Sequence, residues 1–312
     1  MSRDRVLDLP GEGARRPVAD STPPRGGRGS GKRAGQPMPR DPRDVLAAKL
    51  ELPRGEVRER VWSGRTGYEL RNSDVRTLAA VGAFRVVDVR DLQGDRHSNW
   101  HGDVEHLRRA GLVAVSPRVL DGARTQVVTL TPAGRALLER HQRAEEPRQS
   151  FYAGMVKPRE IPHDAKLYRA FSDAATRLQR DGARVERVLL DYELKREYQR
   201  FLQANNRGKA ESSGRPDRSA EEIKEWASAH QLTVVNGHVQ FPDVRIEYER
   251  PDGQSEREDI ELATEHYNAR QMAAKRAAGF TMGRSAGSRL RGSSARSGAT
   301  PFDPHAVEEV LR

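Results

Sequence analysis

Phe241-Pro242-Asp243-Val244-Arg245-Ile246-Glu247-Tyr248-Glu249 leads into the turn Arg250-Pro251-Asp252-Gly253-Gln254, and the chain returns as Glu258-Asp259-Ile260-Glu261-Leu262-Ala263. Apolar and polar residues alternate on both arms, which is the period of a half-buried strand. A Pro-Asp-Gly sequence between two such arms is typical of a tight turn. This stretch therefore predicts an antiparallel β-hairpin, and its register decides which side chains share a face.

One face of the predicted hairpin carries carboxylates. With the turn centred on Asp252, Asp243 lies opposite Glu261 on the same face, and Asp259 is the neighbour of Glu261 there. The other face, which we predict to be buried in the core, is formed by Val244, Ile246, Tyr248, Ile260 and Leu262. The carboxylates could hold a divalent metal. Alternatively, the polar face is solvated, and arginines of the two arms pair with these acids across the strands.

The bulk composition indicates a polyanionic partner. Of 312 residues, 35% are hydrophobic and 32% are charged, with a mean hydropathy of -0.83, which predicts modest domains with unfolded segments. The net charge of +10 favours nucleic acid as a partner. Cysteine is absent, which excludes disulfides, cysteine-bound zinc and thiol catalysis. No apolar run approaches the roughly 20 residues of a membrane helix, so we expect a cytoplasmic, nucleoid-associated protein without a membrane partner.

Shifts in composition along the chain predict five segments. A basic arm rich in Pro, Gly, Ser and Arg, residues 1–55, is expected to be disordered. Two ordered blocks follow, residues 70–142 and 163–283, joined by a polar linker over residues 143–162. Residues 284–312 form a flexible basic tail with a short terminal helix. In the second block, Ser219-Ala220-Glu221-Glu222 is a capping box that predicts the start of a helix. Helices alternate with strands there, so the predicted fold class is α/β or α+β with two domains.

The first block has the element order of a winged helix-turn-helix domain. The sequence predicts helices over residues 73–81, 84–92 and 98–110 and strands over residues 112–115 and 126–130. Thr131-Pro132 opens a further helix, with threonine as N-cap and proline in the first turn. In such a domain the third helix enters the major groove of duplex DNA, and the wing contacts phosphates.

The third predicted helix has one apolar face, formed by Trp100, Val104 and Leu107. If that face is buried, Asp103 and His106 lie on or beside the exposed side together with the candidate DNA contacts. These candidates are Asn99, His101, Arg108 and Arg109, with Arg124 at the wing tip. Acidic residues on the same helix oppose tight phosphate contact.

Three stretches carry a resemblance to MarR-like winged-helix regulators. They are Leu107-Arg108-Arg109-Ala110-Gly111-Leu112-Val113, Asp121-Gly122-Ala123-Arg124 and Val128-Thr129-Leu130-Thr131-Pro132-Ala133-Gly134-Arg135. The resemblance implies a winged helix and, because MarR-like domains often dimerise, a homodimer as a candidate partner. A winged helix that contacts proteins is the alternative. The flanking basic segments favour double-stranded DNA.

The hairpin resembles the core of PD-(D/E)XK nucleases, with Pro242-Asp243 on one arm and Glu261 on the other. The resemblance implies Mg²⁺ held by Asp243 and Glu261 for phosphodiester hydrolysis. The lysine of that pattern, two residues after the acid, is Ala263 here. In an alternative alignment Asp259 is the acid and Glu261 replaces the lysine. Lys275, on the predicted helix that follows, is the candidate to restore the cation.

The order of four motifs is similar to that of the replication-relaxation family of plasmids and integrated elements. The motifs are Pro162-His163-Asp164, Asp191-Tyr192-Glu193-Leu194-Lys195-Arg196, Phe241-Pro242-Asp243 and Glu261-Leu262-Ala263-Thr264-Glu265-His266-Tyr267. The resemblance implies a mobile-element DNA-binding protein that joins a winged helix to a degenerate nuclease-like domain. Two functions follow as hypotheses. One is a Mg²⁺-dependent DNA endonuclease, and the other is a non-enzymatic regulator or replication accessory protein whose second domain binds a partner.

Overall fold

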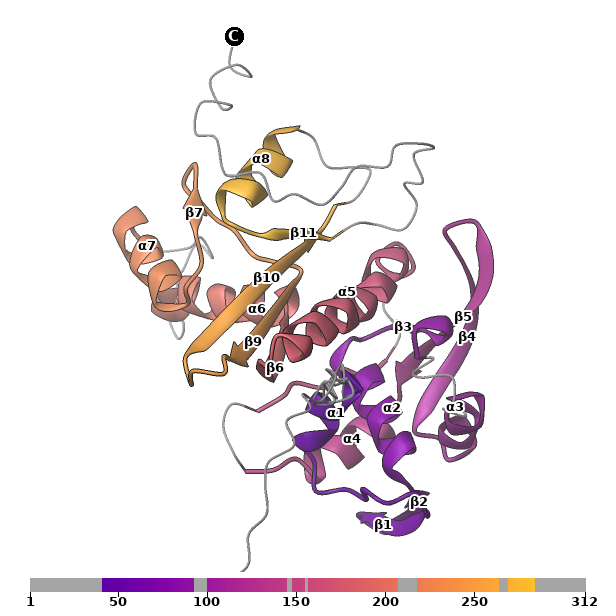
Figure 1. Cartoon of the computed structure of the whole chain (residues 1–312). Coiled ribbons are helices and arrows are strands. Elements are labelled where there is room, and N and C mark those ends of the chain that lie inside the picture. The colour runs from indigo at the N-terminus through magenta and orange to yellow at the C-terminus, as the bar shows by residue number, and fades with distance from the viewer. Residues whose placement is uncertain are drawn as a thin grey trace, which may run out of the picture. The chain divides into compact units, whose positions relative to one another are not determined.

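The structure is a computed structural model of the chain. It describes residues 41–92, 100–144, 148–154, 157–206, 218–263 and 269–283. These residues form a mixed α/β fold (Figure 1), as the sequence predicts. Within the described ranges, each helix is too short or too polar to cross a membrane. The whole predicted basic tail, residues 284–312, lies outside these residues, as do residues 1–40 of the predicted arm.

The N-terminal block combines four helices with two small sheets. Its elements are α1 Arg43–Ala48, β1 Glu59–Ser63, β2 Thr66–Leu70, α2 Asn72–Ala83, β3 Val87–Asp88, the 3-10 helix η1 Val89–Leu92, α3 Trp100–Arg109, β4 Val113–Leu120, β5 Ala123–Leu130 and α4 Pro132–Arg140. Strand β5 is the centre of an antiparallel sheet of order β3-β5-β4, and β1 pairs with β2. The long β4–β5 hairpin is visible in Figure 1. It turns at Asp121-Gly122, where both residues have positive φ, as a two-residue hairpin loop requires.

Local chemistry around Thr131 positions α4. The Thr131 hydroxyl accepts a hydrogen bond from the Gly134 backbone N–H at 3.1 Å and donates one to the Gly111 carbonyl at 2.7 Å. The predicted N-cap is therefore confirmed. A Cβ on Gly134 would overlap the carbonyl oxygen of Leu112, so glycine lets α4 lie directly against the residue that precedes β4.

The C-terminal block is built on a mixed four-stranded sheet. Its elements are α5 Ile161–Arg180, β6 Arg184–Leu190, α6 Asp191–Leu202, the 3-10 helix η2 Ala204–Asn206, α7 Ala220–Ala229, β7 Val234–Val235, β8 His238–Val239, β9 Val244–Glu249, β10 Ser255–Leu262, α8 Ala269–Ala277 and β11 Thr281–Gly283. The strand order is β11-β10-β9-β6, with β6, β9 and β10 antiparallel and β11 parallel to β10. The helix α5 runs along one face of this sheet (Figure 1).

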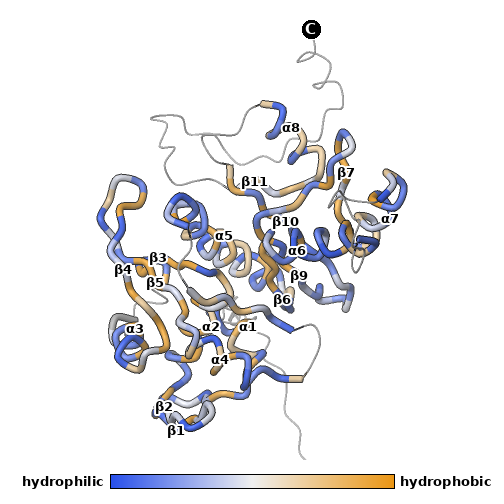
Figure 2. Tube along the Cα trace, turned by 180° about the vertical axis from the view of Figure 1, so that it is seen from behind, coloured by the Kyte–Doolittle hydropathy of each residue, from blue (hydrophilic) through white to orange (hydrophobic). Residues whose placement is uncertain are grey.

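The opposite face of the sheet packs against α6 and α7. Leu189 of β6 is buried with Leu194 of α6 and Ala227 of α7. The helix α6 is mostly hydrophilic and is drawn mostly blue in Figure 2, so only a narrow apolar stripe covers the sheet. The capping box predicted at Ser219 is confirmed, since Ser219 and Glu222 exchange side-chain and backbone hydrogen bonds at the start of α7.

Both blocks contribute to one hydrophobic core. The ring of Phe84, just after α2, lies 5.0 Å from the ring of Phe171 in α5, measured between centroids. The segment predicted as a linker, residues 143–162, is packed in part: Phe151 is buried, and the Gln149 amide exchanges hydrogen bonds with the Val188 backbone on the edge strand β6. A short polar run has no periodicity, which is why its sequence does not predict this packing.

Three further predictions for the N-terminal block need correction. The arm predicted over residues 1–55 extends too far, because α1 is folded and Leu46 and Leu50 are buried. The helix predicted over residues 84–92 is instead β3 followed by η1, since Val87 and Asp88 pair with β5. The β1–β2 hairpin lies where the sequence predicted no element.

Candidate functional site

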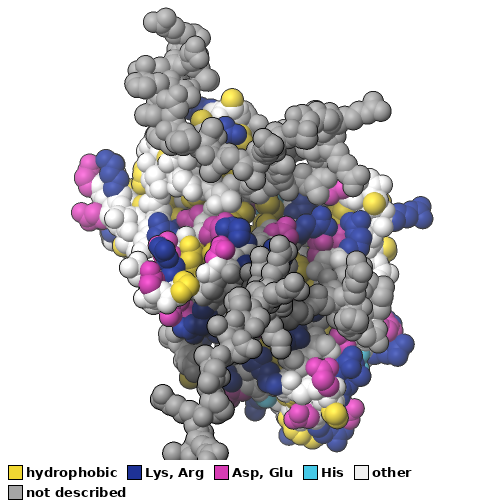
Figure 3. Space-filling model, in the orientation of Figure 1, with side chains coloured by type: hydrophobic (Ala, Val, Ile, Leu, Met, Phe, Trp, Pro, Cys, Tyr) yellow, Lys and Arg dark blue, Asp and Glu magenta, His cyan; other side chains and the backbone are white. Residues whose placement is uncertain are grey.

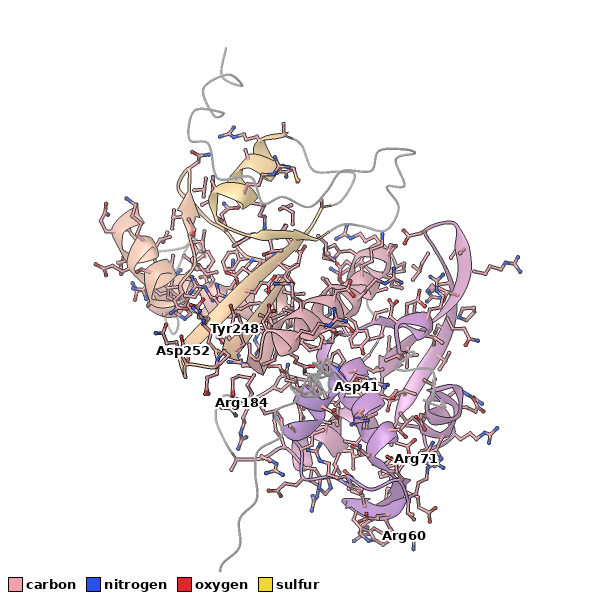
Figure 4. All side chains as sticks on the ribbon, viewed as in Figure 1. Asp41, Arg60, Arg71, Arg184, Tyr248 and Asp252 are labelled. Atoms are coloured by element: carbon pink, nitrogen blue, oxygen red, sulfur yellow. The ribbon has the colours of Figure 1, made fainter. Side chains whose placement is uncertain are left out.

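The β9–β10 hairpin has the predicted register. Ile260 pairs with Val244, and the next pair in this register is Glu261 with Asp243. The Asp243 carboxylate reaches across to accept a hydrogen bond from the Leu262 backbone N–H at 2.8 Å. Figure 4 labels Tyr248 and Asp252 toward the turn, so the two acids lie at the opposite end of the strands. The predicted apolar face is also confirmed, since Val244, Ile246, Ile260 and Leu262 are buried.

The polar face of the hairpin is buried at the end away from the turn, whereas Arg257 and Ser255 nearer the turn are exposed. Glu261 is fully buried, and Asp243 and Arg245 are only 8% and 4% exposed. Arg245 binds Asp259 through two contacts of 2.7 and 2.9 Å and donates to two carbonyls just after α7, at 2.7 and 3.1 Å. Asp259, one of the predicted catalytic acids, is therefore held by an arginine.

Lys275 of α8 stands next to Glu261. Its amine lies 3.0 Å from Glu261 Oε1 and 3.1 Å from Oε2, and it donates to the Phe241 carbonyl at 2.6 Å. The helix α8 thus brings a lysine beside the acid, although residue 263 is alanine.

His163 connects Asp243 to a second acid. His163 Nε2 lies 3.2 Å from Asp243 Oδ2, and Nδ1 lies 3.3 Å from Asp164 Oδ1. Burial alone would lower the pKa of His163, but hydrogen bonds to Asp164 and Asp243, together with their charges, outweigh burial and raise this pKa to about 10. The imidazole is therefore protonated at neutral pH. Arg85 faces Asp164 in turn, with Nη1 3.0 Å from Oδ2.

The carboxylates of Asp243 and Glu261 have the donor chemistry that Mg²⁺ prefers. Each carboxylate already faces a cation of the protein, His163 for Asp243 and Lys275 for Glu261. Among the residues that the structure describes, no group of three or more His, Asp or Glu side chains is arranged to hold a metal ion. A divalent ion can therefore bind this pair only after His163 releases Asp243 and Lys275 releases Glu261.

The predicted DNA contacts lie on α3 and on the β4–β5 hairpin. Arg108 and Arg109 are 50% and 75% exposed, and both bind Glu105 at 2.8 Å. Hydrogen bonds and charges from these two arginines hold the pKa of Glu105 at about 2. Arg124 is exposed, and no described carboxylate lies within ion-pair distance of it. Asn99 and the His101 side chain lie outside the described residues.

Two other residues of α3 hold the helix in place. Asp103, predicted on the exposed side, is buried and binds Arg71 at 2.8 Å, with Arg58 at 3.9 Å. Figure 4 labels Arg71 next to this region. The His106 ring lies 2.6 Å from the Glu69 carbonyl of β2. The sequence could not indicate either contact, because it did not predict the β1–β2 hairpin.

Several charged and aromatic residues that are not among the predicted site residues meet near α6. Glu193 is buried and accepts hydrogen bonds from Ser150 at 2.6 Å and from Tyr152 at 2.8 Å. Tyr192, in contrast, is 48% exposed. Both stand in the motif Asp191–Arg196, whose resemblance to the replication-relaxation family is the sequence signal that includes them. Figure 3 shows basic and acidic side chains interspersed on the face in view.

Comparison of the chain with family models, with curated proteins and with solved structures finds no match.

Proposed function

We propose that this chain binds double-stranded DNA through a winged helix-turn-helix formed by α2, η1, α3 and the β4–β5 hairpin. The observation that carries the proposal is an arginine-bearing helix and an arginine-bearing hairpin on the surface of one small domain. Arg108 and Arg109 are exposed on the helix, and Arg124 is exposed on the hairpin. Such elements suit a groove contact and a phosphate contact. The net charge of +10 adds long-range attraction to a polyanion.

The bracing of α3 supports this proposal. Val104 and Leu107 are buried, and Asp103 and His106 tie the helix to the α2 and β2 regions. A helix that reads base edges has to be held by packing and supporting contacts, because small displacements remove directional hydrogen bonds. The four motifs similar to the replication-relaxation family support a mobile-element or replication-associated protein at the nucleoid.

Arg124→Ala is expected to weaken binding to duplexes of any sequence. One lost phosphate contact should reduce the slope of log Kd against log salt by about 1. Fluorescence anisotropy with a labelled duplex, over about 50–200 mM salt, measures the affinity and the slope together. Arg108→Ala is expected to act in the same direction, since its guanidinium can exchange Glu105 for a phosphate.

The matched control is Arg200→Ala, because Arg200 is an exposed arginine on α6. This substitution changes the net charge as much as Arg124→Ala does, and it should leave the slope of log Kd against log salt unchanged. Equal losses in the Arg124→Ala and Arg200→Ala proteins would show that net charge alone drives binding, and would rule out the proposed DNA-binding face.

Metal-dependent phosphodiester hydrolysis is the second candidate, favoured by the Lys275 amine 3.0 Å from Glu261. Asp243 and Glu261 would hold the ion, which when bound supplies an activated water and stabilises charge on the phosphate. Their positions on neighbouring strands of a mixed sheet support a nuclease-like domain. Lys275 places a cation beside the acids, and His163 holds a proton on Nε2 against Asp243.

Incubation with supercoiled, linear and single-stranded DNA plus Mg²⁺ or Mn²⁺ tests hydrolysis. If the site cleaves DNA, Asp243→Asn and Lys275→Met should each lower the rate by about 100-fold or more. Lys195→Met is the control, because Lys195 pairs with Asp191 on an exposed helix face. If the unmodified protein does not cleave, or Asp243→Asn cleaves as fast as it does, hydrolysis is rejected. The non-enzymatic regulator or accessory protein, with a partner on the C-terminal block, is then the function left.

A further inference from the structure

A polar cavity lies where α4, residues 148–153 and the first turns of α6 meet. Its volume is about 430 Å³, within the range of about 300–1,000 Å³ that is usual for small-molecule sites. Arg85, which follows α2, completes the wall. The lining residues include neither the exposed arginines of α3 and β5 nor the Asp243–Glu261 pair, so the cavity is a separate feature.

The cavity wall has an excess of positive charge. It contains one acid, Glu139, and the four arginines Arg85, Arg135, Arg148 and Arg196. Glu139 is already bound by Arg135 at 2.7 Å, and Arg85 is paired with Asp164 at 3.0 Å, outside the lining. Arg196 is exposed, and in the part of the chain that the structure describes no carboxylate lies within ion-pair distance of it. Guanidinium groups in such a setting favour phosphate, which they bind through two parallel hydrogen bonds.

An aromatic ring stands beside these arginines. Tyr192 is 48% exposed, and the guanidinium carbons of Arg85 and Arg196 lie 5.7 and 5.8 Å from its ring centroid. The ring of Tyr152 meets it edge-on at 5.8 Å. Because Tyr152 also donates to the buried carboxylate of Glu193 at 2.8 Å, the ring of Tyr192 rests on a fixed support.

We propose that this cavity binds a nucleotide unit, with its phosphate against Arg196 and its base stacked on Tyr192. An exposed ring next to unpaired positive charge matches the two parts of a nucleotide, an aromatic base and an anionic phosphate. The same chemistry fits a free mononucleotide or the 5′-phosphorylated end of a single strand. The proposal does not rest on duplex binding by α3.

Isothermal titration calorimetry of the full chain with deoxyadenosine 5′-monophosphate tests the proposal. The nucleotide is expected to bind at least about tenfold more tightly than inorganic phosphate or deoxyadenosine, because each of these lacks one of the two contacts. Arg196→Gln and Tyr192→Ala should each weaken binding by about tenfold or more, whereas Tyr192→Phe keeps the ring and should bind normally. Arg200→Gln, one turn further along α6, is the matched control and should bind like the unmodified protein.

The proposal is overturned by any of three results: no saturable binding of the nucleotide, equal binding of inorganic phosphate, or normal binding by both Arg196→Gln and Tyr192→Ala. Competition with a short single strand, with and without a 5′-phosphate, identifies the source. If the phosphorylated strand competes more strongly than the unphosphorylated one, the ligand is the 5′ end of a strand. If the two strands compete equally, the ligand is the free nucleotide. Arg124→Ala should bind the nucleotide normally, so failure of the duplex proposal and failure of this one are distinguishable.

Discussion

Arg245→Leu is expected to lower the free energy of unfolding by about 3–5 kcal/mol, because it breaks a buried ion pair by removing one partner. Arg245 is 4% exposed and is the bidentate partner of Asp259. The substitution leaves the Asp259 carboxylate with Arg257, whose Nε lies 3.7 Å away. It also removes the donors of the two carbonyls that follow α7. The loss of these charged hydrogen bonds, which are partly buried, adds to the cost.

Urea denaturation followed by circular dichroism measures this loss. Arg250→Leu is the control, because Arg250 is half-exposed and pairs with Asp252 in the hairpin turn and Glu256 on β10. An exposed pair of this kind contributes at most about 1 kcal/mol. The double substitution Arg245→Leu with Asp259→Leu should recover part of the stability, because it removes the buried charge together with its partner.

A loss for Arg245→Leu as small as that for Arg250→Leu would contradict the buried pairing. Asp259 would then be available as a catalytic acid, as the alternative alignment of the nuclease-like pattern requires. Recovery in the double variant, in contrast, would show that the Asp259 carboxylate is paired with Arg245 inside the fold. In that case the candidate site consists of Asp243, Glu261 and Lys275, with His163 beside Asp243.

Gly134→Ala is expected to destabilise the N-terminal block by about 2–3 kcal/mol, as overpacking of a tight contact typically does. The added Cβ would overlap the Leu112 carbonyl oxygen and lie 2.7 Å from Leu130 Cδ1. The carbonyl cannot move freely, because it accepts a hydrogen bond from the Thr131 backbone N–H at 3.1 Å. Alanine is otherwise preferred over glycine in a helix by about 1 kcal/mol, and the clash has to exceed that preference.

Ala136, two residues further along α4, supplies a control with the reverse substitution. It lies on the exposed side of α4, so Ala136→Gly should cost about 1 kcal/mol through helix propensity alone. Thermal unfolding followed by circular dichroism, with both variants, compares the two positions. If Gly134→Ala unfolds at or above the temperature of the unmodified protein, α4 does not approach Leu112 as closely as the structure describes.

Local patterns in the sequence were enough to predict several elements of the fold. Alternation around a Pro-Asp-Gly turn predicted the β9–β10 register, and with it the placement of Asp243 opposite Glu261. Side-chain capping predicted the starts of α4 and α7, at Thr131 and Ser219. These features depend on residues only a few positions apart, so the sequence alone contains the information that determines them.

The tertiary structure alone decided that the acids at the open end of that hairpin are buried. Their partners come from distant parts of the chain: His163 at the start of α5 meets Asp243, and Lys275 of α8 meets Glu261. The alternation of the hairpin distinguishes two faces, but only the elements packed on each face decide which is solvated. Ion pairs between residues far apart in the chain leave no local period in the sequence. The same reason explains why the cavity beside Tyr192 and Arg196 could not be predicted from the sequence.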